Sequence, residues 1–227
     1  MFIGFSLLVF AVLFVIAEAA ERIAKQKRHQ LRAARTIACI AMFSAISAIL
    51  MLLEVPLFFA PGFYKLDFSE LPVLICTFYL GPVSGVVCEF IKVVLKVLLK
   101  GTTTAFVGDF ANFVVGCSLI LPASIVYQAN PSKKGAVLSL LLGTACLTVF
   151  GSLFNAWYLI PKFAELYGIP MDAIIGMGSQ VNASITDLKT LVLFAVVPFN
   201  LLKGAAVSVL TFLLYKRVAG VFFGRNR

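Results

Sequence analysis

The sequence has 227 residues, of which 61% are hydrophobic and 13% are charged, and its mean hydropathy is +1.03. A soluble domain is roughly half apolar and about a quarter charged, so this composition excludes an ordinary water-soluble fold. The net charge of +9 does not indicate a nucleic-acid-binding protein, because the basic residues gather in short segments between apolar runs. An integral membrane protein is therefore expected.

Seven apolar stretches follow one another along the chain, most of them near the length of about 20 residues that a helix needs to cross a bilayer. The third is short and closes at Gly81-Pro82, where a fourth can begin, so these two are predicted to form a hairpin of helices. The seven stretches are residues 1–20, 36–53, 70–80, 82–99, 108–127, 136–160 and 188–215.

The basic residues predict the orientation, because cytoplasmic loops are enriched in Lys and Arg. One cluster follows the first stretch, a second follows the fifth and a third closes the chain, and seven spans bring all three to the cytoplasmic side. Positive charge follows the first stretch rather than preceding it, which favours an uncleaved span over a signal peptide. The clusters are Arg22, Lys25, Lys27, Arg28, Arg32 and Arg35; Lys133 and Lys134; and Lys216, Arg217, Arg225 and Arg227.

Charged and amide side chains inside these stretches are the candidate functional groups, because they are costly in hydrocarbon. Glu89 and Lys92 are three residues apart and are predicted to form an internal ion pair. Asn200 and Lys203 also share a helix face, beside Pro198, which cannot donate a backbone hydrogen bond. We interpret this second pair as part of a ligand site, with an internal structural pair as the alternative. The Asn112 amide also needs a partner, either a neighbouring helix or a solute.

Small residues form a stripe along the second stretch, where Ala34, Ala38, Ala41, Ala45 and Ala48 step by four and three residues. Such a stripe lets another helix approach closely. Docking of a partner protein and packing within this protein's own bundle both remain open.

The sequence lacks the residues of the common enzyme classes. It contains no GxxxxGK[ST] phosphate loop, no HExxH helix and no GxSxG elbow. Its five cysteines are isolated in apolar stretches and its single histidine, His29, lies in a basic segment, so neither a disulfide framework nor a metal site is expected. A membrane enzyme using Asp109, Glu89 and the lysines lacks a nucleophile with a nearby base, so no catalytic residue is assigned.

The chain resembles the riboflavin-specific substrate-binding S components (RibU type) of energy-coupling factor (ECF) transporters. The resemblance covers residues 36–217 and depends on the alanine stripe and four further motifs. These are Leu66-Asp67-Phe68-Ser69-Glu70-Leu71-Pro72, Gly81-Pro82-Val83-Ser84-Gly85, Gly108-Asp109-Phe110-Ala111-Asn112-Phe113 and Pro198-Phe199-Asn200-Leu201-Leu202-Lys203-Gly204.

The resemblance implies an all-α membrane protein, with a six-helix vitamin-binding domain over residues 36–227 and an extra N-terminal span with a basic cytoplasmic linker over 1–35. It implies riboflavin as transported ligand, no cofactor, no enzymatic activity, and a bacterial cell membrane location with a cytoplasmic C-terminus. The implied partners are a transmembrane coupling protein and two ATPases, with Ala38, Ala41, Ala45 and Ala48 as the docking face. The candidate ligand residues are Leu66, Asp67, Gly108, Asn112, Asn155, Tyr158, Asn200 and Lys203.

Three alternatives remain open at this level. Small changes in the pocket can redirect an S component to another vitamin. A self-contained secondary transporter would move solute without partner proteins, and a membrane enzyme would turn over substrate alone.

Overall fold

The computed structural model describes residues 2–23, 33–58, 61–62 and 64–222. Several basic residues of the predicted topology clusters, among them Lys25, Arg32 and Arg225, lie outside these ranges, as does His29. In the first half of the chain the elements are α1 (Phe2–Ile23), α2 (Ala33–Leu52), β1 (Val55–Pro56), β2 (Lys65–Leu66), α3 (Glu70–Leu80) and α4 (Pro82–Lys100). The second half contains α5 (Val107–Ala129), α6 (Lys133–Phe154), η1 (Asn155–Leu159), α7 (Ile160–Tyr167), α8 (Met171–Ser179), α9 (Leu188–Leu191), η2 (Val192–Val196) and α10 (Val197–Phe222).

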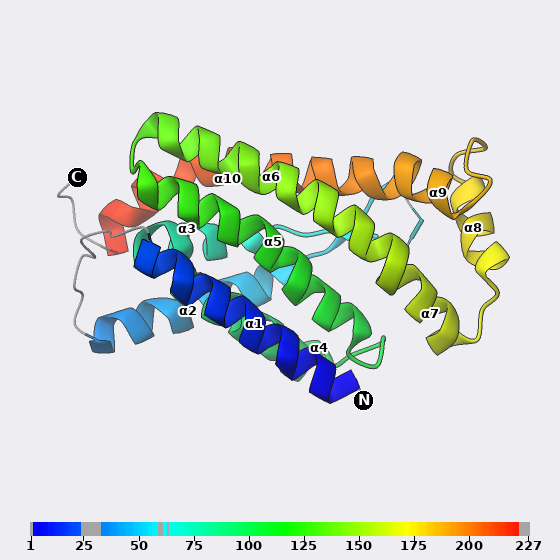
Figure 1. Cartoon of the computed structure of the whole chain (residues 1–227), viewed down its shortest axis with the longest axis horizontal. Coiled ribbons are helices and arrows are strands. Elements are labelled where there is room, and N and C mark those ends of the chain that lie inside the picture. The colour runs from blue at the N-terminus through cyan, green and yellow to red at the C-terminus, as the bar shows by residue number, and fades with distance from the viewer. Residues whose placement is uncertain (1, 24–32, 59–60, 63, 223–227) are drawn as a thin grey trace.

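The long helices lie side by side in one bundle (Figure 1). Helix α6 packs between α5 and α10, and α1 lies across α4 and α5. Among the described residues, four helical stretches are long and apolar enough to cross a membrane: Ala33–Leu52, Val107–Ala129, Lys133–Tyr167 and Leu188–Val218. Large apolar side chains such as Leu141 and Leu213 are exposed on the outside of the bundle, as expected for a surface that faces lipid.

The predicted hairpin at Gly81-Pro82 is confirmed. Helix α3 ends at Leu80 and α4 begins at Pro82, with Gly81 between them at φ +98°, a conformation that strongly favours glycine. Pro82 occupies the first turn of α4, where its missing N–H has no helical acceptor to serve. A β-carbon on Gly81 would also crowd the Glu21 carboxylate of α1.

Helix α3 has only 11 residues, which corresponds to about 16 Å, or roughly half of a hydrocarbon core. Its N-terminus therefore lies deep in the bundle, beside the middle of α4, and the segment that precedes it must enter the bundle from one end. This geometry brings Asp67, Ser69 and Glu70 into buried positions.

The structure differs from the sequence-based prediction at the end of the bundle that carries α7 and α8 (Figure 1). Residues 161–187, which lie between the sixth and seventh apolar stretches, contain most of α7 and all of α8. The fold is also not purely helical, because β1 and β2 form a short antiparallel pair in which Val55 faces Leu66. With two residues each, β1 and β2 are too short to produce a periodic pattern in the sequence.

The apolar core has two parts. The larger cluster fills the bundle between α2, α3, α4, α5, α6 and α10. The smaller one lies where α7, α8 and α9 gather, and consists of Tyr64, Ile160, Ile174, Ile185, Leu191, Ala195, Val196 and Phe199. This second cluster connects the loop after α2 to the ends of the last two long helices.

Candidate functional site

A buried network of charges joins three helices in the middle of the bundle. Lys92 of α4 lies 2.5 Å from Glu89 and 3.5 Å from Glu70 at the start of α3. Lys203 of α10 lies 3.1 Å from the same Glu70 and 3.0 Å from Asp67. Glu70 thus bridges both ammonium groups, and the predicted pairing of Glu89 with Lys92 is confirmed as part of a larger network.

This network contains three carboxylates and two ammonium groups, all of them buried. The neutral Ser69 side chain adds two charge-assisted hydrogen bonds, since it accepts from Lys92 at 3.2 Å and its hydroxyl donates to Asp67. Glu89 Oε2 has no hydrogen-bond partner among the described residues, and Glu89 lies against Gly116 of α5, where a side chain would overlap it. Buried charges are tolerated only with such partners, so the network fixes α3, α4 and α10 relative to one another.

A second polar cluster lies at the end of the bundle nearest α7 and α8. The Tyr64 hydroxyl, from the loop after α2, donates to Asn155 Oδ1 at 2.8 Å, and Asn155 Nδ2 donates to the Gly151 carbonyl at 2.7 Å. The Tyr64 ring lies 5.2 Å from the Phe199 ring. Burial raises the pKa of Tyr64 well above its ordinary value, so the phenol remains a neutral hydrogen-bond donor.

Asn200 extends this cluster to α10. Its amide donates to Ser152 Oγ of α6 at 3.3 Å. A β-carbon on Gly151 would lie 3.1 Å from Asn200 Nδ2 and 3.4 Å from Val115 of α5, so the missing side chain lets three helices converge here. Amide groups that both donate and accept are thereby concentrated between apolar walls, the composition of a small-molecule site.

Two π-helical turns lie in contact at this level, η1 (Asn155–Leu159) after α6 and η2 (Val192–Val196) before α10. Such turns interrupt the α-helical register and occur frequently at functional sites. Asn155 is the first residue of η1, and η2 ends two residues before Pro198, whose ring nitrogen cannot donate to the carbonyl of Phe194. The π turn η2 therefore lies next to the position where Pro198 predicts a missing backbone hydrogen bond.

Ion pairs hold the loop after α2 against α4. Glu54 lies 2.7 Å from Lys65 of β2 and 2.6 Å from Lys100 at the end of α4. Burial acts to raise the pKa of Glu54, but the hydrogen bonds from Lys100 and Lys65 outweigh it and hold the pKa below its usual value. Nearby, Lys96 pairs with Asp109 of α5 at 2.6 Å. The Glu54 pairs thus tie the loop after α2 to the end of α4, and the Lys96 pair joins α4 to α5.

Comparison with known proteins assigns the family. The model of the ECF transporter substrate-specific component matches residues 35–215. The chain belongs to this family. It is 33% identical over 182 residues to the riboflavin transporter FmnP of Bacillus subtilis (80% of this chain and 90% of the relative) and 34% identical over 180 residues to the riboflavin transporter RibU of Staphylococcus aureus (79% and 88%). A solved structure described as the S component of a bacterial ECF transporter has a TM-score of 0.66 at 30% identity, and the match covers 86% of this chain and all of that one. Members of this family are transport components rather than enzymes.

The candidate ligand residues of this S component fall into separate groups. Asn155 and Asn200 lie in the polar cluster at the π turns, whereas Lys203 and Asp67 pair with each other in the charge network. The Tyr158 ring is tilted against Phe154 at 5.0 Å and meets Phe110 edge-on at 6.2 Å. On α5, the Asn112 amide donates to Gly108 of its own helix at 3.1 Å, and Leu66 lies in β2.

Sequence reasoning missed three residues of the polar cluster: Tyr64, Ser152 and Phe199. Ser152 precedes Asn155 by three residues, so helical spacing alone places both on one face and could have identified it. Tyr64 lies in a loop, and its contact with Asn155 spans 91 positions of the sequence, which no local pattern reveals.

The alanine stripe of this S component lies mainly on the surface. Ala34, Ala38, Ala41 and Ala45 are exposed along α2, whereas Ala48 is only 1% exposed and packs inside the bundle. Helix α2 makes its contacts with α3 and α4 through its other face. Within the part of the chain that is described, internal packing therefore accounts for Ala48 but not for the other four alanines.

Proposed function

We propose that this S component binds riboflavin at the end of the bundle that carries α7 and α8, and that this end faces outward. The observation that carries the proposal is the junction of Tyr64, Asn155, Ser152 and Asn200 between the two π turns. Riboflavin combines a flat tricyclic ring with a polar edge and a hydroxylated chain, so it requires aromatic walls and a few convergent amides. The relatives named above are riboflavin transporters, which supports the same ligand here.

In this proposal some candidate ligand residues hydrogen-bond the vitamin and others pack against it. Asn155 and Asn200 hydrogen-bond the polar groups of the vitamin, while Tyr158, Leu66 and the start of α5 at Gly108 and Asn112 line its apolar part. Lys203 reaches the ligand from within the charge network and donates to an oxygen, with Asp67 as its partner. The bound vitamin is cargo, and no chemical step is required.

The proposed topology has six spans in the vitamin-binding domain, namely α2, α3, α4, α5, α6 and α10, preceded by α1 as an additional span. The basic residues at the ends of α1, α6 and α10 support a cytoplasmic C-terminus, because they gather at the end opposite α7 and α8 (Figure 1). The location that follows is the bacterial cell membrane.

We further propose that the exposed alanines of α2 dock onto a transmembrane coupling protein that carries two ATPases. Ala38, Ala41 and Ala45 leave room for a close helix approach, and Ile37 and Ile49 beside them are exposed. ATP hydrolysis by these partners would supply the energy for release inside, because the chain has no nucleotide-binding motif of its own.

A titration of the purified protein with riboflavin tests the ligand assignment, using quenching of flavin fluorescence. Binding at micromolar concentrations or tighter is expected, and Asn200→Ala should weaken it at least tenfold, since one ligand-contacting amide is lost. Asn130→Ala makes the same chemical change at the C-terminal end of α5, away from the polar cluster. It serves as the matched control and should bind riboflavin as tightly as the parent. Tighter binding of thiamine, biotin or folate would assign another vitamin.

Reconstitution distinguishes a binding subunit from a self-contained transporter. Liposomes that contain this chain alone should show no accumulation of riboflavin above that of protein-free liposomes. Uptake by the chain alone would overturn the proposed dependence on partner ATPases.

A further inference from the structure

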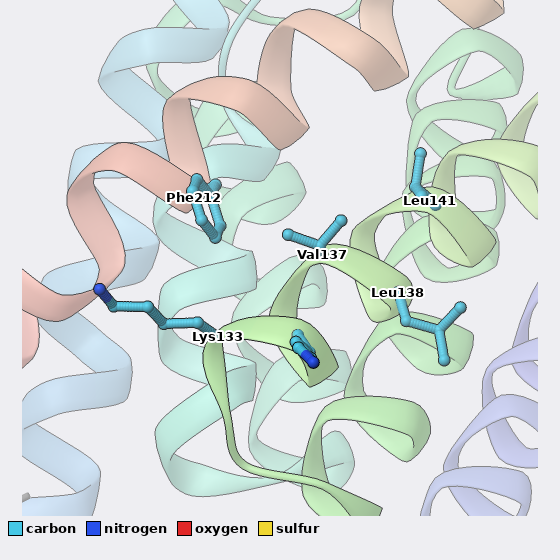
Figure 2. Close-up of a pocket in the computed structure, with 6 residues that line it drawn as sticks. Lys133, Val137, Leu138, Leu141 and Phe212 are labelled. Carbon is cyan, nitrogen blue, oxygen red and sulfur yellow. The ribbon is translucent and has the colours of Figure 1, made fainter.

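A groove of about 340 Å³ opens between α6 and α10 at the end of the bundle far from the polar cluster. Four apolar residues and two lysines line it: Val137, Leu138, Leu141, Phe212, Lys133 and Lys134. Figure 2 shows Phe212 of α10 facing Val137 of α6, with Leu138 and Leu141 further along α6 and Lys133 at the first turn. The groove is therefore apolar along its length and cationic at one end.

The packing of α6 against α10 explains why the groove exists. The two helices are joined where Thr144 and Ser208 share a hydrogen bond of 2.9 Å and Gly204 lies close to Thr144. Toward the basic end Ala136, Leu140 and Thr211 stay buried, whereas Val137 and Phe212 remain 43% and 36% exposed. The groove therefore lies on the exposed side of the contact between the two helices.

The charge around the groove has one sign. Lys133 and Lys134 form no ion pair with any carboxylate in the described part of the chain. Neither α6 nor α10 contains an Asp or Glu, and α10 adds Lys216 and Arg217 beyond the groove. Both lysines also occupy the first turn of the 22-residue helix α6, where the helix dipole favours an anion. A negatively charged occupant is complementary to this end.

The dimensions match one leaflet of a bilayer. From Lys133 to Leu141 the groove runs for eight residues of α6, which corresponds to about 12 Å, close to half of a hydrocarbon core of about 30 Å. Basic pockets between transmembrane helices are suited to anionic lipid headgroups. We propose that this groove binds an anionic phospholipid, with its phosphate at Lys133 and Lys134 and one acyl chain along Val137, Leu141 and Phe212.

Native mass spectrometry of the purified full-length protein tests this proposal, with phosphatidylglycerol and phosphatidylcholine of identical acyl chains as probes. Retention of phosphatidylglycerol should exceed that of phosphatidylcholine at least tenfold. The double variant Lys133→Gln/Lys134→Gln should abolish this difference. The matched control Lys216→Gln/Arg217→Gln removes the same charge from the same end outside the groove lining and should keep the preference within twofold.

A second pair of variants tests the acyl chain. Val137→Trp fills the groove and leaves both lysines in place, so it should reduce retention of phosphatidylglycerol at least fivefold. Leu142→Trp on the same helix, at a residue that is equally exposed but does not line the groove, should not. Inorganic phosphate should fail to displace the lipid, since it lacks the chain.

The outcomes separate the possible occupants. Equal retention of both lipids, or equal losses in the groove and control variants, would overturn the proposal. Displacement by inorganic phosphate would identify a simple anion site instead, and a dimer abolished by Val137→Trp would identify a second copy of the chain as the occupant. Thermal unfolding of every variant checks that the fold is intact, independently of vitamin binding.

Discussion

Single charged side chains in the middle of the bundle are stable only because each has a partner. Lys92 illustrates this, since it is fully buried and holds both Glu89 and Glu70. Replacing Lys92 with Met would leave Glu89 without its cation and Glu70 with only Lys203, in a region that excludes water. Removing one partner of a buried pair typically costs about 3–5 kcal/mol. We expect Lys92→Met to lower the free energy of unfolding by this order, measured by thermal or denaturant unfolding in detergent.

Lys189→Met serves as the control for this variant, because Lys189 is exposed and forms no ion pair with a described residue. The combined variant Lys92→Met/Glu89→Gln should recover part of the loss, since it removes the orphaned charge of Glu89. A change below about 1 kcal/mol for Lys92→Met, in the range of surface pairs, would contradict a structural role for the network.

Tyr64 gives a prediction of the opposite sign. Its hydroxyl occupies the Asn155 oxygen, so a ligand that uses this acceptor must first displace the phenol. Tyr64→Phe keeps the ring against Phe199 and removes the competing donor. A hydrogen bond of this kind contributes about 1 kcal/mol, so we expect riboflavin to bind up to about fivefold more tightly, measured by fluorescence titration. Weakening by tenfold or more would instead mean that the hydroxyl contacts the vitamin.

At this scale the sequence revealed the polar groups, but of their partners only those that lie on the same helix face. The three-residue spacing of Glu89 and Lys92 predicted their contact, because neighbours on one helix face follow from geometry alone. The contact between Lys203 and Asp67 joins residues 136 positions apart. Only the tertiary structure reveals this contact. Lys203 pairs with the carboxylates of Asp67 and Glu70, and it lies three residues after Asn200 of the polar cluster.

Among the elements, α1 is closely integrated with the bundle. The Phe10 ring lies 4.7 Å from Phe90 of α4 and 5.7 Å from Phe113 of α5. At the other end of α1, Glu21 accepts a hydrogen bond of 3.3 Å from the Val83 amide in the first turn of α4. An anionic acceptor at a helix N-terminus satisfies a free amide and interacts favourably with the helix dipole. Helix α1 thus stabilises the turn between α3 and α4.

The effect of this contact can be measured with Glu21→Ala. Loss of a capping interaction usually costs about 1 kcal/mol, so a fall of this size in the free energy of unfolding is expected. Binding of riboflavin should change less than twofold, because the polar cluster lies at the opposite end. Glu18→Ala one turn earlier is the control, since among the described residues Glu18 pairs with the exposed Arg22 alone. Equal losses in both variants would exclude the cap as the cause.

The sequence predicted elements that depend on residue type. It missed elements that depend on a change of helical hydrogen-bond register. The Gly81-Pro82 hairpin was predictable, because few other residue pairs end one helix and begin the next. The π turns η1 and η2 were not, because a change from four-residue to five-residue hydrogen bonding leaves no trace in apolar periodicity. Pro198 indicated only that one backbone hydrogen bond is missing near the end of η2; it did not predict the π turn itself.

The whole molecule has two chemically distinct ends. Basic residues gather where α6 begins and α10 ends, while the other end carries α7, α8 and the polar cluster (Figure 1). Hydropathy and charge alone predicted this polarity and the membrane location. The buried positions of Tyr64 and Asp67 could not be predicted in the same way, since they depend on the short α3 and on contacts with Asn155 and Lys203.

The proposed orientation makes a prediction about both ends at once. Ser179→Cys in α8 and Lys134→Cys in α6 introduce exposed thiols at opposite ends of the molecule. A membrane-impermeant maleimide added to intact cells should label Ser179→Cys and should label Lys134→Cys only after lysis. The parent chain provides the background, because Cys39, Cys76, Cys88 and Cys117 are buried and Cys146 is partly covered on α6. Labelling of Lys134→Cys in intact cells, with Ser179→Cys protected, would reverse the orientation and place the polar cluster on the cytoplasmic side, where an importer cannot capture external vitamin.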